Sequence, residues 1–425
     1  MILYRGKIYD TACRDKLLST LYDDVNETLY KSTLDRQKLL RSVDKIASGL
    51  LSGKYSHLIK ELDIDGLDGQ IERAAELMRY ENTAELIKAQ LPHAGSGEGV
   101  KRYIMPSGVL FHIAAGNADV LPAYSVLSGL VCGNVNVLKL PSQDNGITVK
   151  IMSRLVEEMP ELAEYIYVFD TPSSDVPSMI KMANVADRIV VWGGDEAVSA
   201  VRRIAPPSVP IVEWGHRIGF CCVTGGFEKH EDELYKLAEH IIKTSQLFCS
   251  SCQRIYVIDP DPYSADRFCR FFLPILQEER YKRPQKDIGA VAEATLIRCS
   301  RSVEAAMTGV KTADRVYTGD GCSLSVKDDP ELEISGFFGH VDVTALSLEE
   351  LFRTLRRKRG YLQTASVIAD GDELERIENT VIRAGVVRIT PPDKMSFAYT
   401  AEPHDGVAEL GRYCRIVSKY TEEVL

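Results

Sequence analysis

The sequence predicts an α/β protein with a parallel sheet, and three observations support this fold class. Beyond residue 100, apolar runs of four to six residues recur, as expected of buried strands. Helix-compatible stretches such as 149–158 and 195–204 separate several of these runs, and strands alternating with helices are typical of a parallel sheet. A chain of 425 residues is also too long for one ordinary compact core, which predicts two domains. The apolar runs are 109–114, 135–140, 165–169, 188–191, 209–212, 219–223 and 254–258.

The regions before and after these runs have a different pattern of apolar and charged residues. The first hundred residues are predicted to be helical, because apolar and charged residues alternate at helical spacing through 28–51 and 70–90. A glycine-rich segment at 93–99 then predicts a loop. Beyond residue 260 we expect a helix over 348–358 and strands over 361–368 and 385–389.

Composition excludes several classes of function. The formal charge of −10 and the isoelectric point near 5.5 argue against nucleic acid as a partner. No run of about 18 apolar residues is present, so no membrane span is expected. The N-terminus reaches charge at Arg5, too early for a signal-peptide core, and we expect a cytoplasmic protein. The ten cysteines are then expected to be mostly thiols in a reducing compartment.

Two cysteines stand directly before the apolar run 254–258. Small hydroxyl residues surround Cys249 and Cys252, and no acidic side chain nearby opposes a thiolate. A cysteine held there can act as a nucleophile. A redox pair with this spacing usually follows a strand and starts a helix, whereas this pair precedes a strand. The pattern therefore favours a nucleophile over a thioredoxin-like site.

Polar residues end two of the earlier apolar runs. Asn117 follows the run 109–114, at the carboxyl end where α/β sheets place ligands, and its amide could donate to a developing oxyanion. A turn asparagine is the ordinary alternative. Lys139 ends the run 135–140 and could reach a ribose hydroxyl or a phosphate, the alternative being a solvated lysine.

Candidate site residues also follow two of the later apolar runs. Gly193 and Gly194 follow the run 188–191 and precede a helix, so their backbone N–H groups suit a phosphate or a nicotinamide ribose. The full three-glycine dinucleotide pattern is not present, so this signal alone is weak. Glu213 follows the run 209–212, where a partly buried carboxylate can be a general base and a surface glutamate is the alternative.

The order and spacing of these motifs resemble the aldehyde dehydrogenase superfamily. More narrowly, they resemble the LuxC-type acyl-CoA reductases, which include the fatty-acid reductase component of bacterial luminescence. The resemblance extends from Met105 to the C-terminus, and 36 positions separate Glu213 from Cys249, as in the family. It is sharpest over 108–117, 134–142, 213–217, 249–253 and 404–406.

The resemblance implies an aldehyde-dehydrogenase-like fold, with a Rossmann-type cofactor domain and an α/β catalytic domain. On this basis residues 1–213 form the N-terminal helices and the NADP-binding domain. Residues 214–392 form the catalytic domain with the thiol. Residues 393–425 return to the cofactor domain or to an interface.

The resemblance also assigns roles to the site residues. Asn117 matches the asparagine that holds the oxyanion, and Cys249 matches the nucleophile. Cys252 stands where the LuxC-type pattern has proline, so a role for Cys252 or a disulfide between the two cysteines stays open. Glu213 matches the general base, and no metal is expected in the site. His404, in a His-Asp-Gly segment that resembles the C-terminal one of the family, is given no role.

The cofactor residues follow from the same comparison. Lys139 matches the lysine that binds the adenosine ribose, and Gly193 with Gly194 matches the glycine turn. Ser142 stands where many NAD-preferring relatives carry glutamate, which favours NADPH and leaves NADH as the alternative. Gly336 stands where oxidising relatives have the glutamate that binds the nicotinamide ribose, so the binding of this ribose must differ here.

The function that the resemblance implies is NADPH-dependent reduction of an acyl thioester, fatty acyl in character, to an aldehyde through an acyl-cysteine. One alternative is a CoA-acylating or oxidising aldehyde dehydrogenase, and another is a non-catalytic scaffold in an acyl-transfer complex. The expected partners are an acyl-CoA or acyl-protein donor and an acyl-protein synthetase or acyltransferase subunit. A homo-oligomer is also expected.

Overall fold

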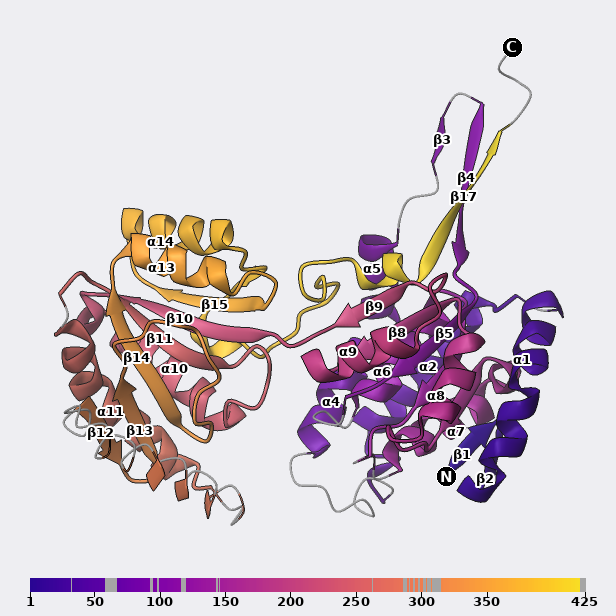
Figure 1. The fold of residues 1–425 in the computed structure, drawn as a ribbon, viewed down its shortest axis with the longest axis horizontal. Helices are drawn as coiled ribbons and strands as arrows, with labels where there is room; N and C mark the ends of the chain where they lie inside the picture. The colour runs from indigo at the N-terminus through magenta and orange to yellow at the C-terminus, as the bar shows by residue number, and fades with distance from the viewer. Residues whose placement is uncertain are drawn as a thin grey trace. The chain divides into compact units, whose positions relative to one another are not determined.

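The chain divides into two compact units in a computed structural model (Figure 1). The first unit comprises Met1–Gly215 and Tyr399–Leu425, and the second comprises His216–Ala398. The structure describes residues 1–420 except for 32, 58–66, 92–94, 98, 116–119, 143, 145, 262, 286–288, 290, 293, 294, 297, 298, 301, 302, 304–306 and 308–314.

A seven-stranded sheet forms the centre of the first unit, in the order β2-β1-β7-β6-β5-β8-β9. Its five parallel strands are fully or largely buried apolar segments, as the sequence predicts. The earliest of them, β5, lies in the middle, with β6 and β7 on one side and β8 and β9 on the other. This order is that of a Rossmann fold, and its ligand crevice is expected where the order reverses, between β5 and β8. These strands are β5 (Val109–Ile113), β6 (Val135–Lys139), β7 (Ile166–Phe169), β8 (Arg188–Trp192) and β9 (Ile211–Trp214).

Helices cover both faces of this sheet, which explains why β5, β6, β7 and β8 are buried and mostly apolar. The connecting helices α6 (Leu121–Val131) and α7 (Ile147–Glu158) contact each other and the N-terminal helix α2 (Arg36–Leu51). The connecting helices α8 (Val176–Asn184) and α9 (Asp195–Ile204) contact each other, and α8 also contacts α1 (Arg14–Lys31). The first unit is therefore a doubly wound α/β domain.

The N-terminus begins with a short hairpin, where the sequence predicts helices only. Strands β1 (Ile2–Tyr4) and β2 (Lys7–Tyr9) pair antiparallel, and β1 continues onto β7. Three-residue strands show no period that a sequence pattern can detect, which is why they are missed. The helical expectation holds from residue 14 onward, through α1, α2, α4 (Leu67–Leu77) and α5 (Tyr80–Gln90).

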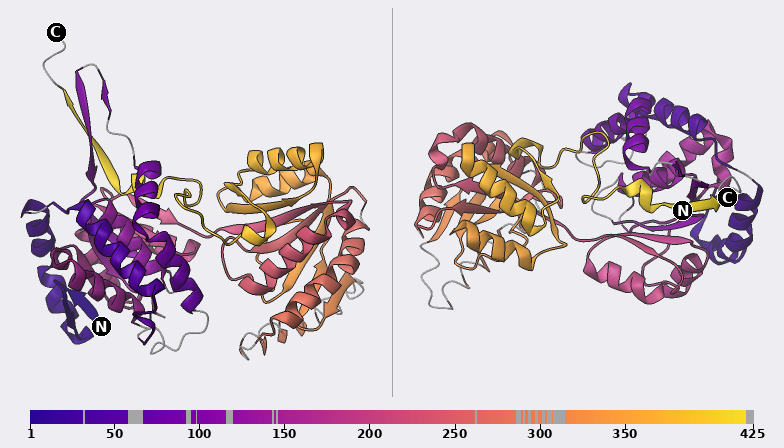
Figure 2. Two further views of the ribbon diagram at one scale, coloured as in Figure 1. Left: turned by 180° about the vertical axis from the view of Figure 1, so that it is seen from behind. Right: turned by 90° about the horizontal axis from the view of Figure 1, so that it is seen from above.

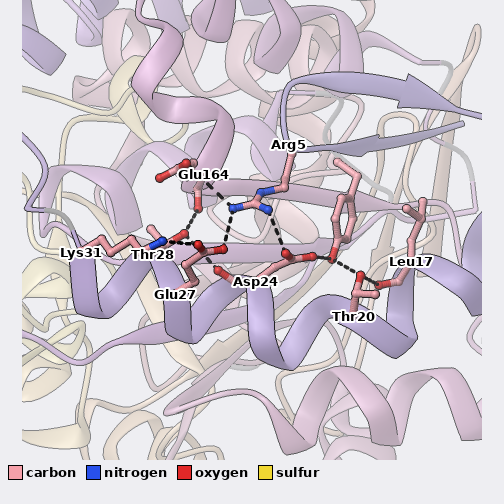
Figure 3. Close-up of polar contacts among 9 residues, drawn as sticks. Arg5, Leu17, Thr20, Asp24, Glu27, Thr28, Lys31 and Glu164 are labelled. Carbon is pink, nitrogen blue, oxygen red and sulfur yellow. Dashed lines mark hydrogen bonds and ion pairs between the residues drawn. The ribbon is translucent and has the colours of Figure 1, made fainter.

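Charged side chains fix this hairpin on helix α1 (Figure 3). The Arg5 guanidinium donates to Asp24 at 2.9 Å and to Glu27 at 3.3 Å. The Tyr4 hydroxyl donates to the same Asp24 carboxylate at 2.5 Å. The contacts span about 20 positions of sequence, so they form only after hairpin and helix have packed together.

A second seven-stranded sheet, in the order β12-β13-β14-β11-β10-β15-β16, forms the centre of the second unit. All its strands are parallel except β12, which pairs antiparallel with β13. Helices lie on both faces, with α10 and α11 on one and α13 and α14 on the other (Figure 1, Figure 2). The strands are β10 (Ile218–Thr224), β11 (Cys252–Ile258), β12 (Val316–Gly319), β13 (Cys322–Val326), β14 (His340–Leu346), β15 (Leu362–Ile368) and β16 (Arg388–Ile389).

Two apolar cores lie on the two sides of this second sheet. One core contains side chains of α10 (Glu231–Thr244) and α11 (Ser264–Lys282), such as Leu237 and Phe268. The other contains side chains of α13 (Leu348–Arg357) and α14 (Gly371–Ala384), such as Leu355 and Val381. The predicted helix over 348–358 and the predicted strand over 361–368 are confirmed, whereas the strand expected over 385–389 is only two residues long.

A β ribbon extends from the first unit (Figure 1). Strand β4 (Val100–Pro106) pairs antiparallel over seven residues with β17 (Cys414–Tyr420), and β3 (Ser96–Gly97) joins the other edge of β4. None of the helices in the described part of the chain has the length and apolar character that a membrane-spanning segment needs.

Candidate active site

Cys249 lies at the exposed tip of a turn between α10 and β11 in the second unit. The Ser251 N–H donates to the Phe248 carbonyl at 2.9 Å, and the Phe248 N–H donates to the Ser251 hydroxyl at 3.3 Å. The Ser251 hydroxyl in turn donates to Thr244, the last residue of α10, at 3.2 Å. These bonds close the turn around Cys249, which remains an exposed residue.

The neighbouring strand β10 approaches this turn closely. A Cβ atom placed on Gly219 would lie 2.7 Å from the carbonyl oxygens of both Ser250 and Ser251. The pairing of β10 with β11 also shifts register between Gly219 and Cys221. A larger residue at Gly219 would therefore displace the turn that carries Cys249.

Cys252 lies in a different environment from Cys249. Its side chain is completely buried at the start of β11, and its thiol donates to the Arg254 carbonyl at 3.5 Å. Burial raises the pKa of Cys252 to about 12. Both cysteines lie in the described part of the chain, and neither forms a disulfide. Exposure thus distinguishes the two thiols, and it supports the resemblance, which assigns the nucleophile to Cys249.

Lys139 ends β6 at the carboxyl edge of the first sheet. It is only 3% exposed, and its ammonium donates to the Ser173 hydroxyl at 2.8 Å. Burial lowers the pKa of Lys139, and the Asp170 carboxylate opposes this effect. A buried ammonium beside a hydroxyl is a donor that a ribose or phosphate oxygen can join. Ser142, three residues later, is exposed in the turn that follows.

Gly193 and Gly194 connect β8 to helix α9, beside the point where the strand order reverses between β5 and β8. A Cβ atom on Gly193 would lie 2.9 Å from the Ala197 side chain, so a small residue is required there. Gly194 caps α9, whose first turn carries the exposed carboxylates of Asp195 and Glu196. Those charges would repel a phosphate at this helix end, so the turn suits a neutral ribose better.

Glu213 lies on β9 and is bound by an arginine. The Arg202 guanidinium, from helix α9, donates to the two carboxylate oxygens at 2.6 and 2.7 Å. The hydrogen bond to Glu213 raises the pKa of Arg202 further, and an arginine is already charged at any physiological pH. Arg202 is not predicted from the sequence, because nothing in a helix sequence indicates which of its arginines will face a neighbouring strand.

The predicted site residues fall into two groups. Strands β6, β8 and β9 belong to one parallel array, so their carboxyl ends lie at the same edge of the first sheet. Lys139 ends β6, Gly193 and Gly194 follow β8, and Glu213 is the next-to-last residue of β9. Cys249 belongs to the second unit. Asn117 lies outside the described residues. Across the described residues, no three His, Cys, Asp or Glu side chains gather as metal ligands would.

His404 joins an aromatic cluster at the same edge of the first sheet. Its ring meets Trp192 edge-on at 5.0 Å and Trp214 at 4.9 Å, and the two indoles stack at 5.3 Å. These tryptophans are the last residues of β8 and β9. The C-terminal segment is therefore part of this edge of the first unit.

A buried carboxyl group lies in the same C-terminal segment. Tyr124 and Tyr413 donate their hydroxyls to Glu409 at 2.9 and 3.0 Å, and Trp214 donates to the Tyr413 hydroxyl at 3.2 Å. Burial raises the pKa of Glu409, and the nearby His404 opposes this effect. This network is not predicted from the sequence, because its members come from α6, β9 and the C-terminus.

Comparison with known proteins decides the family. A family model described as acyl-CoA reductase (LuxC) matches residues 94–416, well over half of the chain. This protein belongs to the LuxC family of acyl-CoA reductases. The sequence-based resemblance is thereby confirmed.

Curated relatives of this LuxC-family protein are distant. The chain is 25% identical over 156 residues to the long-chain acyl-protein thioester reductase of Aliivibrio fischeri, a match that covers 36% of this chain and 32% of the relative. It is 20% identical over 328 residues to the protein of that name from Photorhabdus luminescens, covering 74% of this chain and 64% of the relative. The chain thus matches less than two thirds of the length of either protein.

Solved structures confirm the predicted aldehyde-dehydrogenase-like fold. A methylmalonate-semialdehyde dehydrogenase from Sinorhizobium meliloti, described as putative and solved with NAD, matches with a TM-score of 0.71 at 15% identity, covering 99% of this chain and 97% of that one. Aldehyde dehydrogenase 21 from Physcomitrella patens matches with a TM-score of 0.71 at 12% identity, covering 96% and 91%. At these identities the likeness establishes the fold alone.

Proposed function

We propose that this LuxC-family protein reduces acyl thioesters to aldehydes, with Cys249 as the residue that accepts the acyl group. The observation that carries the proposal is the exposed Cys249 thiol on a hydrogen-bonded turn, beside a Cys252 that burial makes inert. The names of the curated relatives, long-chain acyl-protein thioester reductases, support this reaction class.

The first step is transfer of the acyl group to the protein. The Cys249 thiolate attacks the acyl carbonyl carbon, a carbon–sulfur bond forms, and the bond to the donor sulfur breaks. The donor, coenzyme A or the thiol of a carrier protein, leaves and takes up a proton. We assign stabilisation of the oxyanion to the Asn117 amide and the Cys249 backbone N–H. The product of this step is an acyl-cysteine, and cysteine suits it because its thiolate is also a good leaving group.

The second step is reduction of the acyl-cysteine, and a bound nicotinamide cofactor would supply the hydride. The first unit fits such a cofactor, because its strand order is that of a Rossmann fold and its carboxyl edge carries a buried lysine ammonium. We assign the adenosine ribose to Lys139 and the nicotinamide ribose to the Gly193–Gly194 turn. When the tetrahedral adduct collapses, the Cys249 sulfur leaves as the thiolate and the aldehyde is released.

Aldehyde formation from acyl-CoA tests this proposal. The purified protein with NADPH and a panel of acyl-CoAs of increasing chain length is expected to produce aldehyde, with long fatty-acyl chains preferred. Aldehyde appearance is measured by chromatography and cofactor oxidation by absorbance. A protein that accepts no acyl group on Cys249 from any donor would instead be the non-catalytic scaffold. Faster turnover of aldehyde to acyl-CoA or to free acid would favour the dehydrogenase alternatives.

Cofactor preference is predicted to depend on Ser142. The exposed, neutral Ser142 leaves room for a 2′-phosphate, so the Michaelis constant for NADPH is expected to be lower than that for NADH. Ser142→Glu would place a carboxylate against that phosphate and should raise the Michaelis constant for NADPH by about tenfold or more. Ser142→Gln, of equal size and without charge, is the matched control. A wild-type preference for NADH would contradict the assignment.

The β ribbon supports the expectation of a homo-oligomer. Its strands expose apolar side chains, with Ile416 58% exposed and Tyr103 43% exposed, and its outer strands β3 and β17 are sheet edges. Exposed edges and apolar side chains of this kind are characteristic of surfaces that pair with another chain. We propose that the ribbon joins copies of this protein, and that an acyl-protein synthetase or acyltransferase subunit delivers the acyl group to Cys249.

A further inference from the structure

The turn before Cys249 has an unfavourable backbone conformation. Ser245 and Gln246 both lie in the left-handed region, with φ of 48° and 64°. Phe337 and Phe338 do the same in another turn, with φ of 55° and 49°. Seven non-glycine residues in the described part of the chain have positive φ, and four of them belong to these two turns. Such conformations persist only where the surrounding structure holds them, and they concentrate at functional sites.

The two turns hold each other by hydrogen bonds. The Phe338 N–H donates to the Ser245 carbonyl at 3.0 Å, and the Gly339 N–H donates to the Gln246 side-chain oxygen at 3.0 Å. Behind the second turn, the buried Arg280 guanidinium donates to the Phe338 carbonyl at 2.6 Å. The left-handed residues of each turn are therefore fixed by the other turn, about 90 positions away in sequence.

The Gln246 side chain is the centre of this arrangement. It is fully buried, and its amide nitrogen donates to the Cys252 carbonyl at 3.0 Å and to the Ser335 hydroxyl at 2.8 Å. Its oxygen accepts the Gly339 N–H, so both ends of the amide are in use. The Cys252 carbonyl can only accept and the Gly339 N–H can only donate, which fixes the orientation of the amide. Gln246, which precedes Cys249, thus binds Cys252 after it and also binds the segment that carries the partner turn.

A second glutamine completes a closed ring of bonds. The Gln253 amide nitrogen donates to the Gln246 backbone carbonyl at 2.7 Å. The Gln253 side-chain oxygen accepts from the Ser335 backbone N–H at 3.1 Å and from its hydroxyl at 2.8 Å. Cys249 lies between Gln246 and Gln253 in sequence, and both ends of its segment are tied to Ser335. The exposed tip is therefore anchored by buried polar groups on each side.

We infer that Gln246 is a positioning residue, which sets the place and orientation of the Cys249 thiol through the two interlocked turns. It is a positioning residue and not a catalytic one, because its amide is buried and fully bonded within the protein. The inference rests on the proposed role of Cys249 as nucleophile. A displacement of about 1 Å in a reacting group can cost about 100-fold in rate. A turn that holds Cys249 in place therefore maintains the rate of its reaction.

The test is Gln246→Met, which keeps the length of the side chain and removes its three hydrogen bonds. Alkylation of Cys249 by iodoacetamide, followed by mass spectrometry of the Cys249 peptide, reports on the thiol without requiring turnover. We expect the rate of alkylation, measured across pH, to change by fivefold or more. In the aldehyde-forming reaction kcat is expected to fall by about 10- to 100-fold, with little change in KM for the cofactor.

Gln90→Met is the matched control. Gln90 is 4% exposed, and its amide donates to the Glu402 carbonyl at 2.8 Å and accepts from the Leu410 N–H at 3.3 Å, all in the first unit. This variant should lower the melting temperature as Gln246→Met does, and it should leave Cys249 alkylation unchanged. Equal effects of the two variants on alkylation would mean that Gln246 contributes only to stability, and would overturn the inference.

Ser335→Ala is a milder second variant, in case Gln246→Met does not fold. It removes one acceptor of Gln246 and one donor to Gln253, and a smaller change in Cys249 alkylation in the same direction is expected. If Cys249 is alkylated at the wild-type rate in both Ser335→Ala and Gln246→Met, the inference is contradicted. Because alkylation needs neither cofactor nor acyl donor, failure of the proposed reductase activity would leave this test intact.

Discussion

Replacing Cys249 by alanine is expected to abolish both acyl transfer and aldehyde formation. The acyl group then has no sulfur to accept it, and no other cysteine of this turn is exposed. We expect a loss of at least about 10⁴-fold in kcat, as removal of a covalent nucleophile causes elsewhere. The measurements are labelling of the protein by radiolabelled acyl-CoA and oxidation of NADPH. Labelling retained in Cys249→Ala would show that another residue is the nucleophile.

Cys252→Ala is the matched control for that experiment. The Cys252 thiol is buried, and its pKa is raised to about 12, so it contributes almost no thiolate at neutral pH. The variant should keep most of its activity and lose only about 1 kcal/mol in the free energy of unfolding, as expected for a small buried side chain. Loss of activity comparable to that of Cys249→Ala would mean that both thiols belong to the site.

Releasing Glu213 from Arg202 is expected to divert the acyl-cysteine toward hydrolysis. An acyl-cysteine can take a hydride and give aldehyde, or take water and give a free acid. A general base that activates water accepts a hydrogen bond from that water, and Arg202 already donates to both oxygens of Glu213, so a water must compete with the guanidinium. Arg202→Met should therefore raise acyl-CoA hydrolysis without cofactor by about tenfold or more, since a general base contributes about 10²- to 10⁴-fold.

The measurement is free fatty acid released from acyl-CoA in the absence of NADPH. Adding Glu213→Gln to Arg202→Met should remove the gain, because the amide cannot accept a proton at neutral pH. Arg203→Met controls for loss of charge, since Arg203 is the next residue on α9 and is also exposed. If Arg202→Met hydrolyses acyl-CoA no faster than the wild type, Glu213 is not the base.

Local sequence patterns predicted most of the elements that carry the site. Strands β5, β6 and β8 appear where apolar runs were found, and helix α9 spans the predicted residues 195–204. The strands at the two ends of the chain escaped prediction for different reasons. The hairpin strands β1 and β2 are too short to have a period, and β17 is exposed along almost all of its length.

The residues of the candidate site were likewise predicted only in part. Motif order indicated Lys139, Glu213 and Cys249, because the polar residue at a strand end stands beside its strand in the sequence. The groups that modify them come from elsewhere. Arg202 reaches Glu213 through packing of a helix on a strand, and Gln246 meets Ser335 across 89 positions. A local sequence pattern cannot show which distant residues will contact a site residue.

The sequence by itself determined the α/β fold class, the family and the order of the site residues, since apolar period and motif spacing are properties of neighbouring residues. Only the tertiary structure decided which of Cys249 and Cys252 is buried, and the result supports the assignment of the nucleophile to Cys249 that the family resemblance implies. The two thiols are three positions apart in nearly identical surroundings, and burial by distant segments raises the pKa of one of them while the other stays exposed. Burial is set by contacts across the whole second unit, so it becomes visible only when the chain is folded.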